Sequence, residues 1–505
     1  MSKLAPSRLV AFLDREALGI VVVAVFALFS LAVIPQMLVQ DTWLTLVSGR
    51  EISQNGLPQV DALTVWARGS TWIDQQWLAQ LLFFWTHEVG GIKLVALAHV
   101  TAITAGIASA VAAARSLGAS PLAVSVVAAP AIVAAPWAFQ ARAQTFAIPL
   151  FVWLVWLLAA DSRAPSRRVL LVLPLLVVWA NLHGTVVLAA GLVLVRGLMF
   201  VVEELRSRKP MREWWARGLA LLICPVACLL ASPYGLDLVS YYRTMLVSSQ
   251  LRTFIDEWGP TTPSSQTFVF FLLAFVTIGV LARFGHRLTP TERVILVLTL
   301  ASGLLAVRSI IWFVLAAVVL VPVLVDKVLV LPPLRTARLR VPAAVIALAA
   351  VGGTTLVVAI APTTWYVREW PVAAGDRIVS SSRDLEAQVL SDERYSDWLL
   401  WEHPELVGRI AYDVRFELLD HASLNRLYRY QNQIGANSSR LADDFEVVAF
   451  DQRARPGLLA SLEAAGNFRV VHRERTITVL ARVGSGEPSE AVQTSSAQGR
   501  SRTRR

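Results

Sequence analysis

The chain has 505 residues, of which 55% are hydrophobic and 16% are charged, and its mean hydropathy is +0.57. This composition excludes an ordinary soluble enzyme, because apolar runs long enough to cross a bilayer recur through the first 361 positions. The formal net charge of +10 does not indicate a nucleic-acid partner, since most basic residues lie in short loops between the apolar runs. We therefore expect a polytopic α-helical membrane protein.

The first apolar run follows Lys3, Arg8 and Arg15 and is longer than the apolar region of a signal peptide, so we expect an uncleaved helix. Cys224 and Cys228 lie one turn apart in a later apolar run, which favours packing over a disulfide or zinc site. The apolar pattern predicts about eleven spans, at 17–39, 91–114, 121–139, 144–160, 169–182, 185–202, 217–231, 266–282, 292–306, 309–325 and 341–361.

The basic residues predict the orientation of these spans. With the N-terminus in the cytoplasm, nineteen lysines and arginines fall on the cytoplasmic side and seven on the other. An odd number of spans then places the C-terminal part outside. We expect a transmembrane domain over 1–361, an extracytoplasmic α/β domain over 362–483 and a disordered basic tail over 484–505.

The first outer loop, 41–90, predicts two helices that lie in the membrane interface. The stretch "DTWLTLVSGREI" is amphipathic at helical spacing, and "DQQWLAQLLFFWTHEV" follows it after the turn "NGLP". In the C-terminal domain, "RIAYDV", "FEVVAF" and "TITVLARV" are typical of strands, and "PGLLASLEAAG" is typical of a short helix.

Unusual polar residues gather in the predicted outer loops, while the cytoplasmic loops offer arginines and little else. Because polar groups near a span are costly, this placement indicates a functional face. The candidates are Asp41, Asp61, Asp74, Arg142, Gln144, Asn181, His183, Tyr234, Asp237, Asp256, Glu257, Trp258 and Arg308.

Several of these residues have a structural interpretation that the sequence leaves open. Asp41 precedes a helix and is also suited to capping it. His183, in "NLHG", is compatible with a tight helical hairpin, and Tyr234, in "SPYG", with a turn. Arg308 either extends to the interface or meets an anion. Arg196, within the sixth predicted span, is expected to extend toward the basic side.

The spaced motifs "DTW…SGREI…GLP…D", "W…WLAQLL…GG", "RAQ", "WANLHG", "SPYG", "EW" and "VRSIIWF" resemble a bacterial family of GT-C-like membrane proteins. The GT-C superfold is that of membrane glycosyltransferases. The resemblance implies a polyprenyl-phosphate-linked sugar as donor, and Asp41 as the general base or metal ligand. It also implies a multi-pass protein of the inner (plasma) membrane. The chain has Thr45, Gln76 and Gln80 where relatives often carry histidine or glutamate, so the cofactor stays unknown, with Mg²⁺ or Mn²⁺ as a candidate.

Inverting sugar transfer needs a base for the acceptor proton and a group that stabilises the leaving phosphate. Asp41 suits the first role, and Arg308 or Arg142 suits the second. Asp256, Glu257 and His183 are candidate acceptor or metal contacts. The acceptor is an envelope glycan, lipid or protein, and no nucleic acid is expected. Two alternatives remain: a lipid or small-molecule transporter, which the scarcity of mid-span charge disfavours, and a non-catalytic scaffold of envelope assembly.

Overall fold

The computed structural model describes residues 8–207, 215–247, 255–328, 338–382, 387–435 and 437–483. The chain folds into two compact units. The first consists of Met1–Val60 and Thr71–Glu369, and the second of Asp61–Ser70 and Trp370–Arg505. A short segment of the predicted first outer loop therefore folds with the C-terminal part of the chain. The predicted tail over 484–505 lies outside the described residues.

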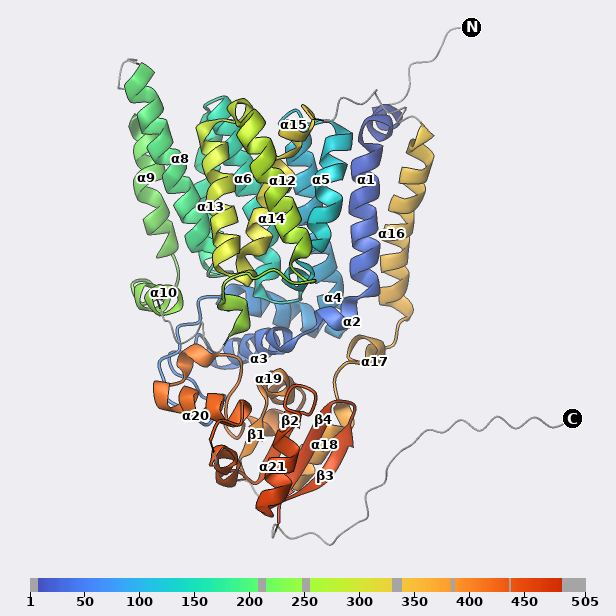
Figure 1. Ribbon diagram of the computed structural model, residues 1–505, viewed down its shortest axis with the longest axis vertical. Helices are drawn as coiled ribbons and strands as arrows, with labels where there is room; N and C mark the ends of the chain where they lie inside the picture. Colours follow the sequence, from blue (N-terminus) through green and yellow to red (C-terminus); the bar gives the residue numbers. More distant parts are fainter. Residues whose placement is uncertain are drawn as a thin grey trace, which may run out of the picture. The chain divides into compact units, whose positions relative to one another are not determined.

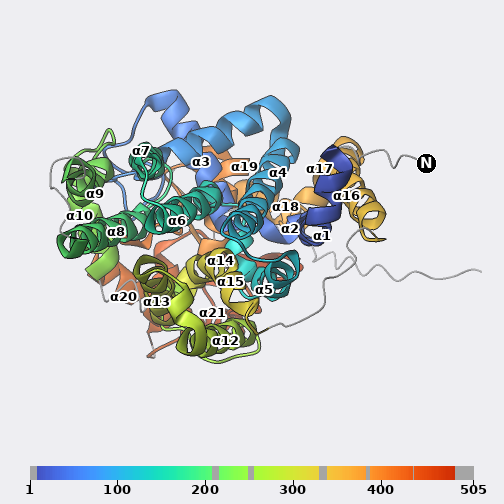
Figure 2. The ribbon, with the colours of Figure 1, turned by 90° about the horizontal axis from the view of Figure 1, so that it is seen from above.

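The first unit is a helical bundle (Figures 1 and 2). Its α-helices are α1 (Arg8–Ala32), α2 (Ile34–Met37), α3 (Gln40–Asn55), α4 (Trp77–Ser116), α5 (Pro121–Val133), α6 (Ala147–Arg163), α7 (Val172–Ala180), α8 (Val186–Ser207), α9 (Trp215–Leu229), α10 (Asp237–Val247), α12 (Phe268–Phe284), α13 (Pro290–Leu305), α14 (Ile310–Leu320), α15 (Pro322–Val325), α16 (Arg340–Ile360) and α17 (Thr363–Tyr366). Short 3₁₀ helices include Pro136–Phe139, Ala143–Phe146, Asp256–Trp258 and Val307–Ser309.

Within the described residues, six helical segments are long and apolar enough to cross a membrane. They are Val10–Ala32, Trp77–Ser116, Ala143–Arg163, Val186–Arg206, Phe268–Arg287 and Arg340–Ile360. Three shorter apolar helices are Pro121–Val133, Ala216–Leu229 and Val307–Leu320. The polytopic helical class is confirmed, whereas the predicted count of eleven spans stays a prediction.

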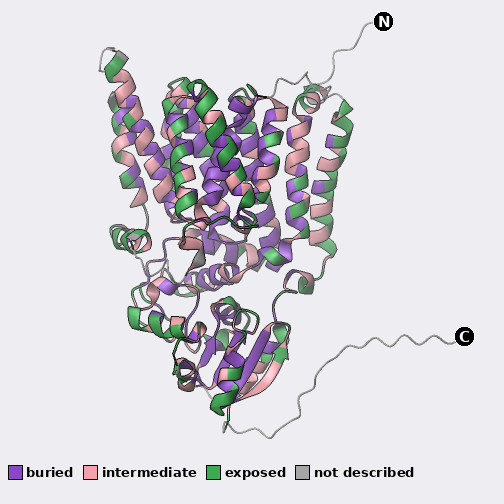
Figure 3. Cartoon of the chain, in the orientation of Figure 1, coloured by how far each residue is buried: buried purple, intermediate pink, exposed green. Residues whose placement is uncertain are grey.

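The core of the bundle surrounds α14, in which every residue from Ile310 to Leu320 is buried. Figure 3 shows this contrast, since α14 is buried along its length while α16 is largely exposed or intermediate. Phe151, Trp179 and Trp312 form an aromatic cluster, with the Phe151 and Trp312 ring centroids 5.1 Å apart. In lipid, helices associate through dispersion contacts and close packing. A densely packed centre is therefore expected for a bundle of this apolar composition.

Two features place polar residues at one end of the bundle. Helix α3 lies across the ends of the spanning helices instead of running parallel to them (Figure 1). Helix α4 is interrupted at Gly90 and Gly91, where Gly91 has φ +62° in the left-handed region that favours glycine. The interruption separates the segment that follows Trp77 from the apolar segment that ends at Ser116.

The interpretation of Arg196 was wrong. Its side chain is fully buried and does not extend to the interface. Its Nε donates to Asp161 at 2.8 Å, and its Nη1 donates to Glu203 at 2.9 Å. A buried guanidinium needs such partners because an unpaired charge in hydrocarbon is costly. The carboxylate of Asp161, near the end of α6, is an acceptor that the sequence pattern of α8 alone did not reveal.

The second unit is built on a four-stranded sheet of order β1-β2-β4-β3. The strands are β1 (Val389–Ser391), β2 (Val447–Asp451), β3 (Phe468–Glu474) and β4 (Ile477–Arg482). β1 pairs with β2 in parallel, and the other two pairs are antiparallel. The helices are α18 (Val372–Ser381), α19 (Glu393–Glu402), α20 (His421–Gln431) and α21 (Leu458–Ala465).

Two of the three predicted strands and the predicted helix are present in this unit. Strands in "FEVVAF" and "TITVLARV" and the helix in "PGLLASLEAAG" are present as β2, β4 and α21. The prediction of a regular strand in "RIAYDV" was wrong. Ile410 forms isolated bridges with Val389 and Thr64, because the segment lies between β1 and part of the first outer loop. β1 and β3 were not predicted, since β1 is three residues long and β3 carries charged residues.

Candidate active site

An ion-pair cluster joins three segments of the first unit that are far apart in the sequence. Asp41 lies in the first turn of α3, Arg142 lies between two 3₁₀ helices after α5, and Glu257 lies in the 3₁₀ helix Asp256–Trp258. Arg142 Nη1 donates to Asp41 Oδ2 at 3.2 Å and to Glu257 Oε2 at 3.3 Å. Burial lowers the pKa of Arg142, but the charges of Glu257 and Asp41 outweigh this and raise it. The guanidinium is therefore a permanent cation at this position.

Local hydrogen bonds hold Asp41 against Arg142. Val39 is the residue that precedes α3, and its N–H donates to Thr42 Oγ1 at 3.0 Å. Asp41 therefore does not cap this helix, which answers one question that the sequence left open. The Thr42 hydroxyl donates to the carbonyl of Ala141, and the Ala141 N–H donates to the carbonyl of Met37 at 2.8 Å. The first turn of α3 is thereby fixed to the residue before Arg142.

His99, on α4, supports the same segment from its other side and was not singled out from the sequence. Its Nδ1 lies 2.9 Å from Thr145 Oγ1, and its Nε2 lies 2.9 Å from the carbonyl oxygen of Phe139. The ring therefore bridges the two 3₁₀ helices on either side of Arg142. A histidine inside an apolar helical run was the available signal, because a buried imidazole has to find hydrogen-bond partners.

The ion pairs with Asp41 and Glu257 use only one of the three guanidinium nitrogens of Arg142. Its Nε and Nη2 are buried and have no hydrogen-bond partner within the described part of the chain. The same holds for Nε2 of Gln144, two residues later. A buried donor without an acceptor costs roughly 1–3 kcal/mol, so three such donors within one short segment are suited to an acceptor-rich group. A phosphate has that character.

A second arginine, Arg308, lies directly before α14 and close to the cluster. Arg308, in the 3₁₀ helix Val307–Ser309, places its guanidinium carbon 4.5 Å from the ring centroid of Trp258. Val307 N–H donates to the carbonyl of Gly259 at 3.2 Å, which ties this turn to the turn that carries Glu257. The contact with Trp258 holds Arg308 in place by a cation–π interaction.

His183 adds a neutral hydrogen-bonding group. Burial first, and then the positive charges of Arg308 and Arg142, hold the pKa of His183 well below its ordinary value of 6.5. The N–H of Thr185 donates to His183 Nδ1 at 3.3 Å. Because Nδ1 accepts this bond, the proton of the neutral ring resides on Nε2. His183 therefore acts as a donor through Nε2 in this environment.

The remaining predicted residues take separate positions. Tyr234 is buried, and its hydroxyl donates to the carbonyl of Pro58 at 2.9 Å. Asp74 is buried, and its Oδ1 accepts from Gln80 Nε2 at 3.0 Å. Asp256 begins the 3₁₀ helix that carries Glu257, but its side chain lies outside the described residues. We refer below to Asp41, Arg142, His183, Glu257 and Arg308 as the cluster.

Asp61 belongs to the second unit. Its Oδ1 lies 2.7 Å from Arg415 Nη2, and its Oδ2 accepts from the N–H and hydroxyl of Thr64 at 3.1 and 2.9 Å. Arg415 also pairs with Asp413. Asp61 is 1% exposed, so this arrangement uses its carboxylate to fasten the loop segment to the C-terminal fold.

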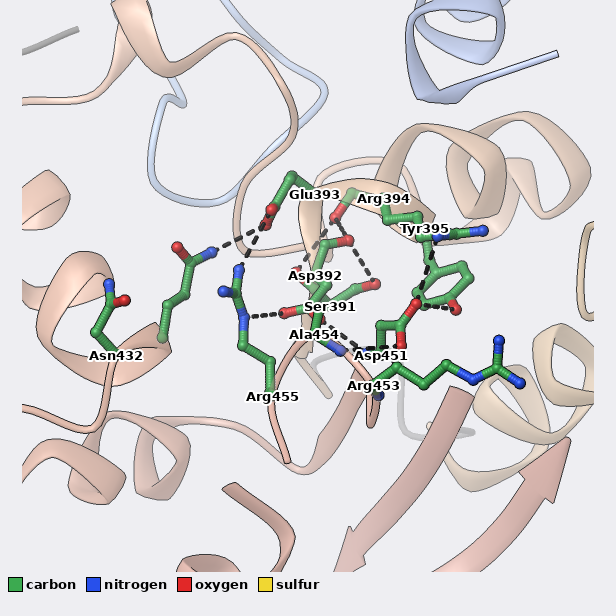
Figure 4. Close-up of polar contacts among 12 residues, drawn as sticks. Ser391, Asp392, Glu393, Arg394, Tyr395, Asn432, Asp451, Arg453, Ala454 and Arg455 are labelled. Carbon is green, nitrogen blue, oxygen red and sulfur yellow. Dashed lines mark hydrogen bonds and ion pairs between the residues drawn. The ribbon is translucent and has the colours of Figure 1, made fainter. Parts of the chain in front are cut away.

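A second polar cluster, shown in Figure 4, lies at the carboxyl ends of β1 and β2. Asp392 follows β1, and its Oδ2 accepts from the N–H of Asp451 at 2.8 Å. Arg455 Nη2 lies 3.3 Å from Glu393 Oε1, while Gln431 Nε2 donates to Glu393 Oε2 at 2.9 Å. Burial, followed by the charge of Glu393, raises the pKa of Asp392 to about 7. The hydrogen bonds among these residues are typical of a cluster that joins α19 to the sheet.

The donor set at Arg142 does not fit a bound Mg²⁺ or Mn²⁺. These ions prefer several carboxylate and carbonyl oxygens around one point, whereas Asp41 and Glu257 both face the same guanidinium. Among the described residues, no three His, Cys, Asp or Glu side chains are grouped to hold a metal ion. The positive charge at this site is supplied by arginine.

The solved structure of ArnT from Cupriavidus metallidurans in the apo state matches 92% of this chain and 98% of its own, with 14% identity and a TM-score of 0.51. At this identity the likeness shows the fold alone, and it confirms the GT-C-like fold expected from the sequence motifs.

Two structures of an oligosaccharyltransferase from Archaeoglobus fulgidus also match. AglB in complex with an inhibitory peptide and a dolichol-phosphate has 10% identity over 88% of this chain and 72% of its own, with a TM-score of 0.45. The apo form has 11% identity, over 89% of this chain and 72% of its own, with a TM-score of 0.41. No family model matches the sequence, and no curated protein matches it.

Proposed function

We propose that this protein is a membrane glycosyltransferase that moves a sugar from a polyprenyl-phosphate donor to an envelope glycan, lipid or protein acceptor. The observation that carries the proposal is the Arg142 guanidinium, which pairs with Asp41 and Glu257 through one nitrogen, while its Nε and Nη2 have no partner among the described residues. The GT-C fold supports the same class. Membrane insertion suits a donor whose lipid remains in the bilayer.

In this proposal the reaction is a single inverting displacement at the anomeric carbon. An acceptor oxygen attacks that carbon, and the bond from the carbon to the phosphate oxygen breaks. Asp41, whose side chain is 33% exposed, takes the acceptor proton as general base. Its bond to a single nitrogen of Arg142 leaves its other oxygen available for that proton.

The leaving group is a lipid phosphate, which keeps its electron pair and needs positive charge. Arg142 offers Nε and Nη2, Arg308 offers a second guanidinium, and neutral His183 offers its Nε2–H. Fixed cations in a site shielded from water stabilise such a charge better than water does, since they need no reorganisation. Glu257 keeps Arg142 in place and is a candidate contact for acceptor hydroxyls.

The test is turnover by the full chain in lipid nanodiscs with a panel of tritiated polyprenyl-phosphate sugars. Asp41→Asn should lower turnover by roughly 10²–10⁴-fold, the contribution typical of a general base, while binding of the polyprenyl phosphate alone persists. Glu51→Gln makes the same chemical change on the same helix and should leave turnover unchanged. Full turnover by Asp41→Asn, or no transfer from any donor by the unchanged chain, would contradict the proposal.

The same preparation separates the alternatives. A transporter would carry the labelled lipid across a vesicle membrane without transferring the sugar, and an assembly scaffold would do neither. Either result, together with the absence of sugar transfer in the assay, would contradict the glycosyltransferase proposal and favour the corresponding alternative.

A further inference from the structure

A groove in the first unit runs between α1, α4 and α16, three helices that lie together at one edge of the bundle (Figure 2). Its volume is about 980 Å³, near the upper end of the roughly 300–1,000 Å³ usual for ligand pockets. Small and apolar side chains form its walls, among them Gly19, Val23, Ala108, Ala112 and Ala350. Phe12, Ile20 and Leu97 add larger apolar side chains to the lining.

Helix α16 forms one wall of the groove. Of its side chains, only Ala343 and Ala350 are buried, while Leu348 and Val351 are exposed. The lining is mainly apolar, although the hydroxyls of Thr101, Thr104 and Thr354 also contribute, and the groove lies among helices that hydrocarbon would surround. A flexible acyl chain suits such a lining, in which alanine, glycine and valine side chains are frequent.

One end of the groove is charged. Arg115 Nε donates to Glu16 Oε2 at 2.8 Å, and Arg15 Nε donates to Glu16 Oε1 at 2.8 Å. Two guanidinium groups thus share one carboxylate, which leaves one net positive charge. The Arg15 side chain is 68% exposed, and its two terminal nitrogens have no partner among the described residues. Arg340 and Asp14 lie 3.8 Å apart nearby and balance each other.

We propose that this groove binds one anionic glycerophospholipid, with an acyl chain between α1, α4 and α16 and its phosphate at Arg15. Arginine binds phosphate through paired N–H donors, and the net positive charge favours an anionic headgroup over a zwitterionic one. The lipid fills the gap left by α16 and holds that helix to the bundle. The site does not depend on the proposed sugar transfer, because the groove follows α1 from Phe12 to Ala27, whereas Asp41 lies beyond α1 in α3.

The test is native mass spectrometry of the full chain in detergent with equal amounts of dioleoylphosphatidylglycerol and dioleoylphosphatidylcholine. We expect one phosphatidylglycerol to be retained in preference to phosphatidylcholine. Arg15→Gln should weaken that retention about fivefold, the effect of one basic residue on an anionic lipid. Ala108→Phe, which fills the groove, should abolish it. Thermal unfolding of each variant in detergent alone shows whether the fold persists.

Arg287→Gln is the matched control, since Arg287 is an exposed arginine in the connection between α12 and α13. It should leave retention unchanged. Equal retention of the two lipids, an equal loss in Arg287→Gln, or retention that survives Ala108→Phe in a folded protein would overturn the proposal. Displacement of the phospholipid by a polyprenyl phosphate in an Arg15-dependent manner would also overturn it, because the groove would then belong to the sugar donor.

Discussion

Asp41 and Arg142 meet through a 3.2 Å hydrogen bond from Nη1 to Oδ2, although they are 101 residues apart in the chain. The bond uses one of the three guanidinium nitrogens, and Glu257 shares that same nitrogen. Two carboxylates therefore position an arginine whose other donors remain available. The positive charge of Arg142 and the orientation of its guanidinium are therefore the central properties of the cluster.

Replacing Arg142 should test that property directly. Arg142→Lys keeps a positive charge but loses the planar set of donors, so we expect turnover to fall by roughly 10²–10³-fold, as when one donor to a developing anion is removed. Binding of polyprenyl phosphate to the variant should weaken as well, and both quantities are measured with the full chain in nanodiscs. Arg50→Lys, on α3 outside the cluster, is the control. Unchanged turnover in Arg142→Lys would show that a point charge suffices.

The depressed pKa of His183 predicts a pH effect on stability. The unfolded chain binds a proton at His183 near pH 6.5, whereas the folded chain does so only at much lower pH. The stabilising contribution is therefore present above pH 6.5 and is lost as the pH falls toward the folded value. Thermal unfolding from pH 7.5 to 5 should show a smaller loss of stability for His183→Gln than for the unchanged protein. An identical pH dependence in the two proteins would contradict a buried neutral ring.

Asp392 should produce the opposite trend. Its pKa is about 7 in the folded chain against an ordinary value of 3.8, so the folded state holds this proton more tightly than the unfolded state. The contribution is fully present below pH 3.8 and is lost as the pH rises through 7. Asp392→Asn should flatten that decline when unfolding of the C-terminal unit is followed from pH 4 to 8. Asp420→Asn, at an exposed carboxylate, should leave the decline unchanged.

Asp61 offers a test that separates a structural role from substrate binding. Its carboxylate is buried against Arg415, and removal of one partner of such a pair costs roughly 3–5 kcal/mol because the other charge is left without compensation. Asp61→Asn should therefore lower the thermal stability of the C-terminal unit. The fraction that stays folded should retain its Michaelis constant for the donor. A variant of normal stability with a raised Michaelis constant would restore Asp61 to the binding site.

The sequence by itself determined the features that depend on local chemistry. Apolar runs of bilayer length predicted the polytopic class, and the amphipathic pattern after Asp41 predicted a helix that the structure shows as α3. Alternating strands and a Pro-to-Gly helix predicted β2, β4 and α21. These features follow from neighbouring residues, because helix and strand periodicity are properties of short segments.

Only the tertiary structure decided which of the polar residues meet. Asp41, Arg142 and Glu257 converge because α3, the turns after α5 and the turn before α12 pack together, and no local pattern encodes that packing. The same holds for Arg196, whose partner Asp161 lies on another helix, and for Asp61, whose partner Arg415 follows it far along the chain. A charge in an apolar environment requires a counter-charge. The sequence therefore predicts that such a residue has a partner, but it does not identify the partner residue.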